Sequence, residues 1–254
     1  MAKRDRLQNP KTHAQWAKDG RGQGTGRDYK PWLSIHDFAG ITKCSRIKGW
    51  KTGRTHGLFS PLEVKAFYLL DWEDDVTDIR EQFPIPLEAT IQIAQSLRIP
   101  HPKSGGGFSM LPTTFLINRG TEETAISVTP KEPKKRHAIL KAYWEGRGIS
   151  HHVWTENEID AAVAQNIEWV HPYRGETPQV PEEELFVQIA TGQPLKDVAR
   201  SLDKHHGTGS TIRSIRCLIA QKQWEVDMTS PISIQTPLTL LKRHADQELH
   251  HRVA

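Results

Sequence analysis

A helical pattern of apolar residues begins just after Ser60. Serine is a favoured N-cap residue, and Pro61 suits the first helical position because the N–H it lacks would have no partner there. The apolar positions that follow are Leu62, Val64, Ala66, Phe67, Leu69 and Leu70, and they extend to Trp72. The pattern therefore predicts a helix that starts at residue 61 and is largely buried.

The next hundred residues alternate between strand-like and helix-like patterns. Strands are predicted over 76–84, 113–117, 124–128 and 151–155. Helices are predicted over 87–97, 134–146 and 156–164, and residues 100–110 form a glycine-rich loop. The order of these elements predicts an α/β fold in which a mixed sheet is flanked by helices.

Residues 171–184 are rich in proline and polar residues, which marks a linker. Beyond it, helices are predicted over 182–190, 194–202 and 210–222, and alternating apolar residues between Trp224 and Ile234 predict a hairpin. Three helices followed by a two-stranded wing are typical of a winged helix, and a generic three-helix packing module is the alternative. We thus expect an arm over 1–30, an α/β domain over 31–170 and a winged-helix-like domain and tail over 171–254.

Composition narrows the function classes. The 254 residues carry 34 basic and 30 acidic side chains, so any binding to nucleic acid has to rest on local clusters rather than on the net charge of +4. Two cysteines, Cys44 and Cys217, are too few for a disulfide framework or a cysteine zinc site. No apolar run is long enough for a membrane span and the N-terminus is polar, so we expect a cytoplasmic protein.

Two pairs of adjacent histidines raise the question of a metal site. Adjacent residues on a strand point to opposite faces, so His151 and His152 cannot jointly bind one ion. His205 and His206 fall in a predicted turn, where we expect phosphate contact or simple exposure. The spacing of these histidines therefore predicts no zinc site.

The first 30 residues carry eight Lys or Arg against three Asp, together with a run of four glycines between Gly20 and Gly26. Such a segment has little apolar surface to bury, so we expect a basic flexible arm. Either it orders on a partner, with Trp16 and Trp32 as anchors and Arg21 and Arg27 as DNA contacts, or it is a solubilising tail.

Three sequence blocks carry a resemblance to a known family. They read GRGQGTGRDYKPW at 20–32, RTHGLFSPLE at 54–63 and DWEDDVTDIREQFP at 71–84. In this order and spacing they resemble the TnsA family, the endonuclease subunits of heteromeric cut-and-paste transposases. The resemblance covers roughly residues 15–170. It implies a restriction-endonuclease-like fold, a role in DNA transposition and recombination, and a bacterial cytoplasmic, nucleoid-associated location. The implied partners are double-stranded DNA at the transposon ends, a TnsB-like transposase and a TnsC-like ATPase.

The resemblance also implies where catalytic groups should lie. In the family a helix Glu, a strand Asp and an [E/Q]-x-K tripeptide hold Mg²⁺ and activate water for DNA cleavage. These positions fall on Glu63, on Thr114 and on Ser127-Val128-Thr129, so only Glu63 matches. A hydroxyl binds Mg²⁺ far more weakly than a carboxylate, and Thr129 cannot supply a positive charge. We therefore expect the 5′-end endonuclease activity to be lost or impaired, and Mg²⁺ to be the cofactor only if activity remains.

Two other residues are candidates to replace the missing catalytic groups. Lys131 lies two residues beyond Thr129, and Glu73 belongs to a carboxylate cluster beyond the predicted helix that carries Glu63. If Lys131 replaces the missing lysine or Glu73 joins a metal site, the alternative is an active Mg²⁺-dependent endonuclease that cuts transposon 5′ ends. A freestanding regulator derived from such a subunit is a third interpretation.

DNA contacts are expected from two basic groups. Arg213, Arg216 and Lys222 lie on the third helix of the C-terminal domain, away from its apolar stripe, as in a recognition helix; a solvated helix face is the alternative. Lys134, Lys135 and Arg136 enter a helix just after the strand that holds Ser127, where a nuclease fold faces its substrate.

Overall fold

The computed structural model describes residues 10–37, 43–104, 107–132 and 134–243. The chain divides into two compact units, Met1–Ile159 and Asp160–Ala254. Each unit is described below by itself.

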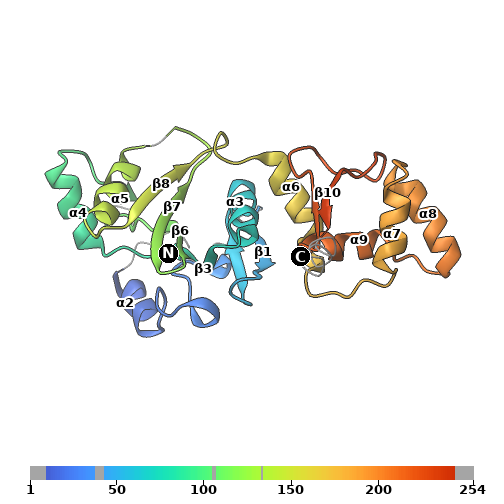
Figure 1. Ribbon diagram of the computed structural model, residues 1–254. Coiled ribbons are helices and arrows are strands. Elements are labelled where there is room, and N and C mark those ends of the chain that lie inside the picture. Colours follow the sequence, from blue (N-terminus) through green and yellow to red (C-terminus); the bar gives the residue numbers. More distant parts are fainter. Residues whose placement is uncertain (1–9, 38–42, 105–106, 133, 244–254) are drawn as a thin grey trace, which may run out of the picture. The chain divides into compact units, whose positions relative to one another are not determined.

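A four-stranded mixed sheet is the centre of the first unit (Figure 1). Its strands are β3 (Val76–Phe83), β6 (Thr113–Arg119), β7 (Glu122–Val128) and β8 (Ser150–Trp154), in the order β3-β6-β7-β8. The first two pairings are antiparallel and the last is parallel. The predicted α/β class with a mixed sheet is therefore confirmed.

Helices flank this sheet as predicted. In α3 (Pro61–Trp72) the side chain of Ser60 accepts the Glu63 N–H at 3.1 Å, which confirms the predicted start of the helix. Helices α4 (Leu87–Ser96) and α5 (Lys135–Glu145) enclose a core with residues of the sheet. The buried members of that core are Ile85, Ala94, Leu111, Leu116, Ala125, Ile139, Leu140, Tyr143 and Trp144.

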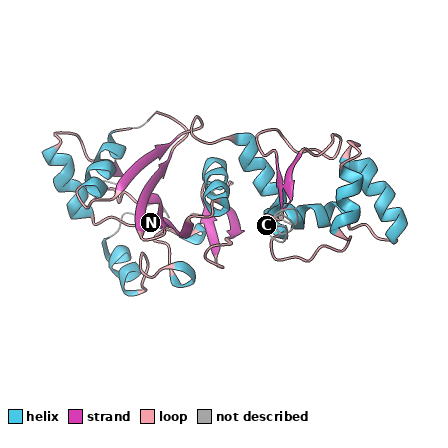
Figure 2. Ribbon diagram, in the orientation of Figure 1, coloured by secondary structure: helices cyan, strands magenta, loops and turns pink. Residues whose placement is uncertain are grey.

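Two short hairpins were not predicted. Strand β1 (Ser45–Lys48) pairs with β2 (Thr55–Leu58) just before α3, and β4 (Lys103–Ser104) pairs with β5 (Gly107–Phe108) within the glycine-rich loop (Figure 2). Strands of two to four residues show too little alternation to be recognised from their sequence.

The predicted flexible arm is folded from Pro10 onward, which corrects that prediction; residues 1–9 lie outside the described part. Helix α2 (Pro10–Lys18) is followed by the short helices η1 (Gly26–Asp28) and η2 (Ile35–Asp37). Trp16, Tyr29 and Trp32 are buried, and the two indole rings meet edge to face at 5.4 Å. These aromatic side chains give the segment enough apolar surface to pack, although its average composition is polar.

Gly22, one of the four glycines between residues 20 and 26, lies at a position where only glycine fits. Gly22 has a φ of +76°, and a Cβ built there would lie 2.3 Å from Cγ of Pro84. Any side chain would therefore both strain the backbone and collide with the loop after β3. The close approach holds the N-terminal segment against the sheet.

The second unit contains α6 (Ala161–Val170), η3 (His171–Tyr173), α7 (Glu182–Ile189), α8 (Leu195–His206), α9 (Thr211–Ala220), β9 (Trp224–Val226) and β10 (Leu240–Arg243). Helix α6 starts later than the predicted helix at 156–164, because Asp160 caps it by accepting from Ala162 N–H and Val163 N–H. The division between the units also falls before α6, earlier than the boundary expected at residue 170.

An asparagine on α6 explains why this helix belongs with the second unit. Nδ2 of Asn166 donates to the carbonyls of Met228 at 2.9 Å and Ser230 at 2.8 Å, and its Oδ1 accepts the Ile232 N–H at 2.8 Å. These three bonds hold the segment after β9 in an irregular conformation. The strand that pairs with β9 is consequently β10, and the prediction of a hairpin strand near Ile232 and Ile234 is wrong.

Candidate functional site

Glu63, which was predicted to match the family's helix glutamate, lies in the first turn of α3. Its Oε2 accepts the Phe59 N–H at 2.9 Å while its own N–H donates to Ser60. These two bonds tie Glu63 to the two residues that precede the helix, so the carboxylate already has a structural role at the helix start. Burial raises the pKa of Glu63, although the bond from Phe59 and the nearby charge of Arg136 oppose that rise.

Thr114, predicted at the position of the family's strand aspartate, lies on β6, and its hydroxyl forms a hydrogen bond to β7. The paired positions of β6 and β7 end at Phe115 and Ile126, so Val128 lies two residues beyond the last pair. Oγ1 of Thr114 accepts the Val128 N–H at 3.0 Å. The side chain thus adds a hydrogen bond between the strand ends and adds no charge.

Ser127 and Thr129, predicted at the outer positions of the family tripeptide, are buried at the end of β7, at 2% and 5% exposure. Oγ of Ser127 lies 2.9 Å from Nε2 of His151, and the Thr129 N–H donates to the Trp154 carbonyl at 2.9 Å. Burial, helped by the nearby charges of His152 and Lys141, lowers the pKa of His151 to about 4. This part of the site is therefore uncharged at neutral pH.

His137 near the start of α5 is a second neutral histidine in this region that the sequence did not single out. It is 2% exposed, and its Nδ1 accepts the Lys134 N–H at 2.8 Å. Burial and the neighbouring charges of Arg136, His151 and Lys134 lower its pKa to about 4. Its sequence context, a lysine-rich helix start, gave no sign that it would be buried.

The residues at the four family positions do not fit Mg²⁺. The ion prefers six oxygen ligands in octahedral geometry and is usually held by one or more carboxylates together with water. Here Glu63 offers one carboxylate, which already accepts a backbone N–H, and the hydroxyls of Thr114 and Ser127 are engaged in the bonds described above.

Neither candidate replacement residue is brought into a metal site with Glu63. Glu73 is the C-cap of α3, ten residues after Glu63, which corresponds to about 15 Å along the helix axis. Glu73 instead forms an ion pair with Arg119. The two glutamates therefore cannot share an ion, which corrects the prediction that Glu73 joins the site. Lys131 is exposed in the segment between β7 and α5, and its participation stays a prediction.

A buried charge cluster lies in the same unit and was missed from the sequence. Glu81 on β3 is 1% exposed and receives hydrogen bonds from two guanidinium nitrogens of Arg54, while its Oε2 lies 2.8 Å from Nδ1 of His56. Burial by itself would raise the pKa of Glu81, but the bonds from Arg54 and His56 outweigh it and lower the pKa to about 2. All three residues fall within the sequence blocks that carry the family resemblance, which is the one signal that could have revealed the cluster.

The arginines of α9 that were predicted to contact DNA have partners within the second unit. Seven of the ten residues of α9 are buried. Arg213 forms an ion pair with Glu176, and the guanidinium of Arg216 lies over the rings of Trp169 at 4.3 Å and Tyr173 at 4.9 Å. Nη1 of Arg216 also donates to the Tyr173 hydroxyl at 2.9 Å. Both arginines are thus engaged within the unit, and Lys222 follows the C-terminal end of the helix.

The other basic residues are placed differently. Lys134, Lys135 and Arg136 are all exposed around the start of α5 and form a contiguous cationic cluster. In the N-terminal segment, Arg27 is exposed in η1, whereas Arg21 pairs with Asp37 at 2.6 Å. Of the predicted DNA contacts in the first unit, Arg27 and the three residues around the start of α5 are therefore exposed.

Within the described residues, no helix has the length and apolar character needed to cross a bilayer.

Two comparisons with known proteins agree with this picture. A family model described as the TnsA endonuclease C-terminal domain matches residues 158–228, a range that starts beside the boundary between the two units. Over 227 residues the chain is 34% identical to the transposon Tn7 transposition protein TnsA of Escherichia coli, and the match covers 82% of each chain.

Proposed function

The chain belongs to the TnsA family, and we propose that it serves as a transposition subunit whose 5′-end cleavage has been lost while its binding roles remain. In this role it binds transposon-end DNA in the bacterial cytoplasm, at the nucleoid, together with a TnsB-like transposase and a TnsC-like ATPase. No Mg²⁺ is held at Glu63.

One observation carries the proposal. The residues at three of the four family positions are uncharged, and the hydroxyls of Thr114 and Ser127 take part in hydrogen bonds within the sheet. DNA hydrolysis at a restriction-type site needs carboxylates to hold the metal and a cation to stabilise the transition state. Removing one such group usually costs a factor of roughly 10² or more in rate, so the joint loss supports a silent site.

DNA binding is assigned to the cationic cluster of Lys134, Lys135 and Arg136 rather than to α9. All three side chains are exposed, whereas Arg216 of α9 is stacked on aromatic rings of its own unit and Arg213, although exposed, is paired with Glu176. The order of α7, α8 and α9 followed by β9 and β10 supports a winged-helix-like C-terminal domain. In that domain the third helix supplies core packing and leaves DNA contact to other surfaces.

The DNA-binding assignment is tested by replacing Lys134, Lys135 and Arg136 together with alanine. Each phosphate contact contributes about −0.9 to the slope of log affinity against log salt concentration. The triple variant should lose up to about three of these contributions, which makes the slope less steep. Lys141→Ala, two turns further along α5, is the matched control. An unchanged slope in the triple variant would exclude this surface.

The loss of cleavage is tested on the transposition products. With the partner transposase and ATPase present, joining without 5′ cleavage leaves the donor attached and yields cointegrates, so simple insertions should be rare and Glu63→Ala should not change the ratio. The combined variant Thr114→Asp, Ser127→Gln and Thr129→Lys should restore some 5′ nicking in Mg²⁺ or Mn²⁺. Abundant simple insertions that disappear with Glu63→Ala would overturn the proposal and point to Lys131 as the replacement cation.

A further inference from the structure

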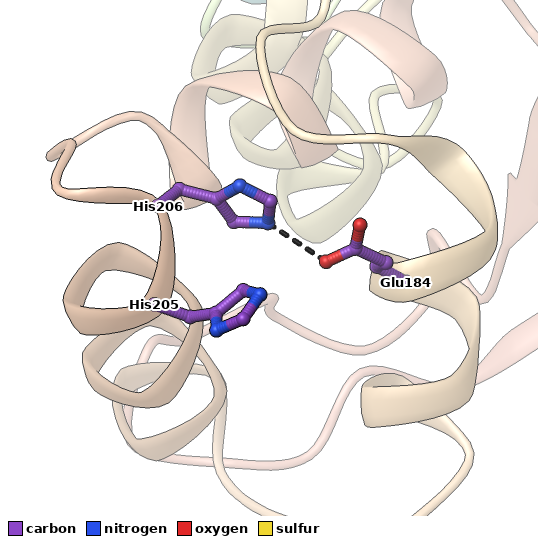
Figure 3. Close-up of side chains that lie close together, drawn as sticks. All are labelled: Glu184, His205 and His206. Atoms are coloured by element: carbon purple, nitrogen blue, oxygen red, sulfur yellow. Dashed lines mark hydrogen bonds and ion pairs between the residues drawn. The ribbon is translucent and has the colours of Figure 1, made fainter.

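Three side chains of metal-binding types converge where the first turns of α7 approach the end of α8. Glu184 comes from α7, and His205 and His206 are the last two residues of α8. One potential ligand atom from each residue lies within 4.8 Å of those of the other two (Figure 3). The carboxylate of Glu184 points toward His206, with Oε2 at 2.7 Å from Nε2.

The fold explains how neighbouring histidines turn toward one glutamate. Helix α8 stops at His206 because Gly207 adopts a left-handed conformation, with φ +64°, and its N–H caps the Asp203 carbonyl. The imidazole rings of His205 and His206 are 4.9 Å apart and nearly perpendicular, and in Figure 3 the His205 ring lies beside the Glu184 carboxylate. Their position at the C-terminal end of a helix also favours positive charge, which includes a bound cation.

The neighbouring charged groups leave Glu184 available. Glu182 accepts from the Trp224 indole N–H at 2.9 Å, and Glu183 pairs with Arg243 at 3.2 Å. Asp203 is held by the N–H and hydroxyl of Thr211. The side chains of Glu184 and His206 are 42% and 23% exposed, so an ion and its water ligands can reach them from solvent.

We propose that Glu184, His205 and His206 bind one divalent transition-metal ion of the zinc class. Two imidazoles and one carboxylate suit Zn²⁺, Co²⁺, Ni²⁺ or Cu²⁺, whereas Mg²⁺ and Ca²⁺ prefer oxygen ligands alone. With metal–ligand bonds of about 2.0–2.2 Å, ligand atoms around a tetrahedral ion lie roughly 3.3 Å apart. Small side-chain rotations from the observed spacing reach that geometry, and the ion takes the place of the hydrogen shared by His206 and Glu184.

The bound ion joins two consecutive helices of the chain. It links the N-terminal end of α7 to the C-terminal end of α8, and it leaves a coordination position for water. This site belongs to the second unit and shares no residue with the family positions around Glu63. Its existence is therefore independent of the proposed loss of cleavage.

The test is a calorimetric titration of the full chain with Zn²⁺, and with Mg²⁺ as the comparison ion. Any purification histidine tag is removed, and His244, His250 and His251 are replaced by glutamine so that histidines near the C-terminus cannot bind metal. We expect one Zn²⁺ per chain, no Mg²⁺ binding at this site, and a visible Co²⁺ absorption spectrum typical of nitrogen and oxygen ligands.

Single replacements identify the ligands. Because loss of a residue that merely supports a metal ligand weakens binding roughly 10- to 100-fold, Glu184→Gln, His205→Gln and His206→Gln should each weaken it by more than about a hundredfold. His152→Gln, at an exposed position in the middle of β8, is the matched control and should bind normally. Glu184→Gln retains a partner for His206, so it keeps the test valid if a histidine variant fails to fold. Absence of Zn²⁺ binding, binding unchanged by Glu184→Gln, or equal binding of Mg²⁺ would overturn the proposal.

Discussion

Replacing Arg216 tests whether α9 is a DNA-recognition helix or a helix that packs in the core of its unit. A guanidinium over aromatic rings contributes about 0.5–1 kcal/mol at exposed sites and about 2 kcal/mol when desolvated. The hydrogen bond to the Tyr173 hydroxyl adds about 1 kcal/mol. Arg216→Ala should therefore destabilise the second unit by about 2–3 kcal/mol. Tyr173→Phe, which removes only the hydrogen bond, should cost about 1 kcal/mol.

Hydrogen exchange is the suitable assay because the chain has two units, and a single unfolding curve would mix them. In Arg216→Ala, the amides of α9 and α6 should exchange faster, by the factor that corresponds to the expected destabilisation of about 2–3 kcal/mol. Arg213→Ala is the matched control, since its exposed ion pair with Glu176 is worth no more than about 1 kcal/mol. If Arg216→Ala leaves protection unchanged and instead weakens DNA binding with a flatter salt dependence, the assignment of Arg216 to core packing is refuted.

Three further predictions concern the first unit. Glu63→Gln should stabilise the protein at neutral pH. Because burial raises the pKa of the folded carboxyl, the folded state binds its proton more tightly, and wild-type stability falls as pH rises above the unfolded value of about 4.3; hydrogen exchange of the first unit should show the advantage of the variant growing across that range. Glu81→Gln should cost the first unit roughly 3–5 kcal/mol, measured by the same method, by leaving Arg54 buried with a neutral partner. Since the pKa of Glu81 is about 2, its contribution is present above the unfolded value near 4.3 and is lost as pH falls toward 2. Thr113→Val removes the acceptor of the Trp144 indole N–H and should cost about 1–3 kcal/mol, whereas Thr113→Ser should cost much less.

Local signals in the sequence were sufficient for the four-stranded sheet and the helices that flank it, but not for the two short hairpins or for α2. Ser60 and Pro61 determined the start of α3, and the alternation of apolar residues located the strands that pair at Phe115 and Ile126. The start of α6 was misplaced because Thr155 and Glu158 form a local turn ahead of the true cap; the Thr155 N–H and hydroxyl both donate to Glu158.

The candidate site was predictable in position but not in its interactions. The family motif picked out Thr114 and Ser127 in the sequence. Their hydrogen-bond partners, Val128 and His151, depend on the register of β6 with β7 and on the parallel pairing of β7 with β8, which the motif does not reveal. Such contacts depend on pairing between segments 14 and 24 residues apart, which composition and periodicity do not encode. The approach of Glu184 to His206 was not predicted either, because it depends on how α7 lies against α8.

The three hydrogen bonds of Asn166 have a practical consequence for dissecting the protein. A protease that cuts in the exposed stretch around Gly175 and Thr177 would sever α6 from α7 in the chain, but not from the segment after β9. The two fragments should therefore separate on a denaturing gel and yet elute together from a gel-filtration column. A recombinant C-terminal piece that begins at the proline-rich stretch would lack α6 and expose the apolar face that this helix covers. A piece that begins at or before Asp160 retains it.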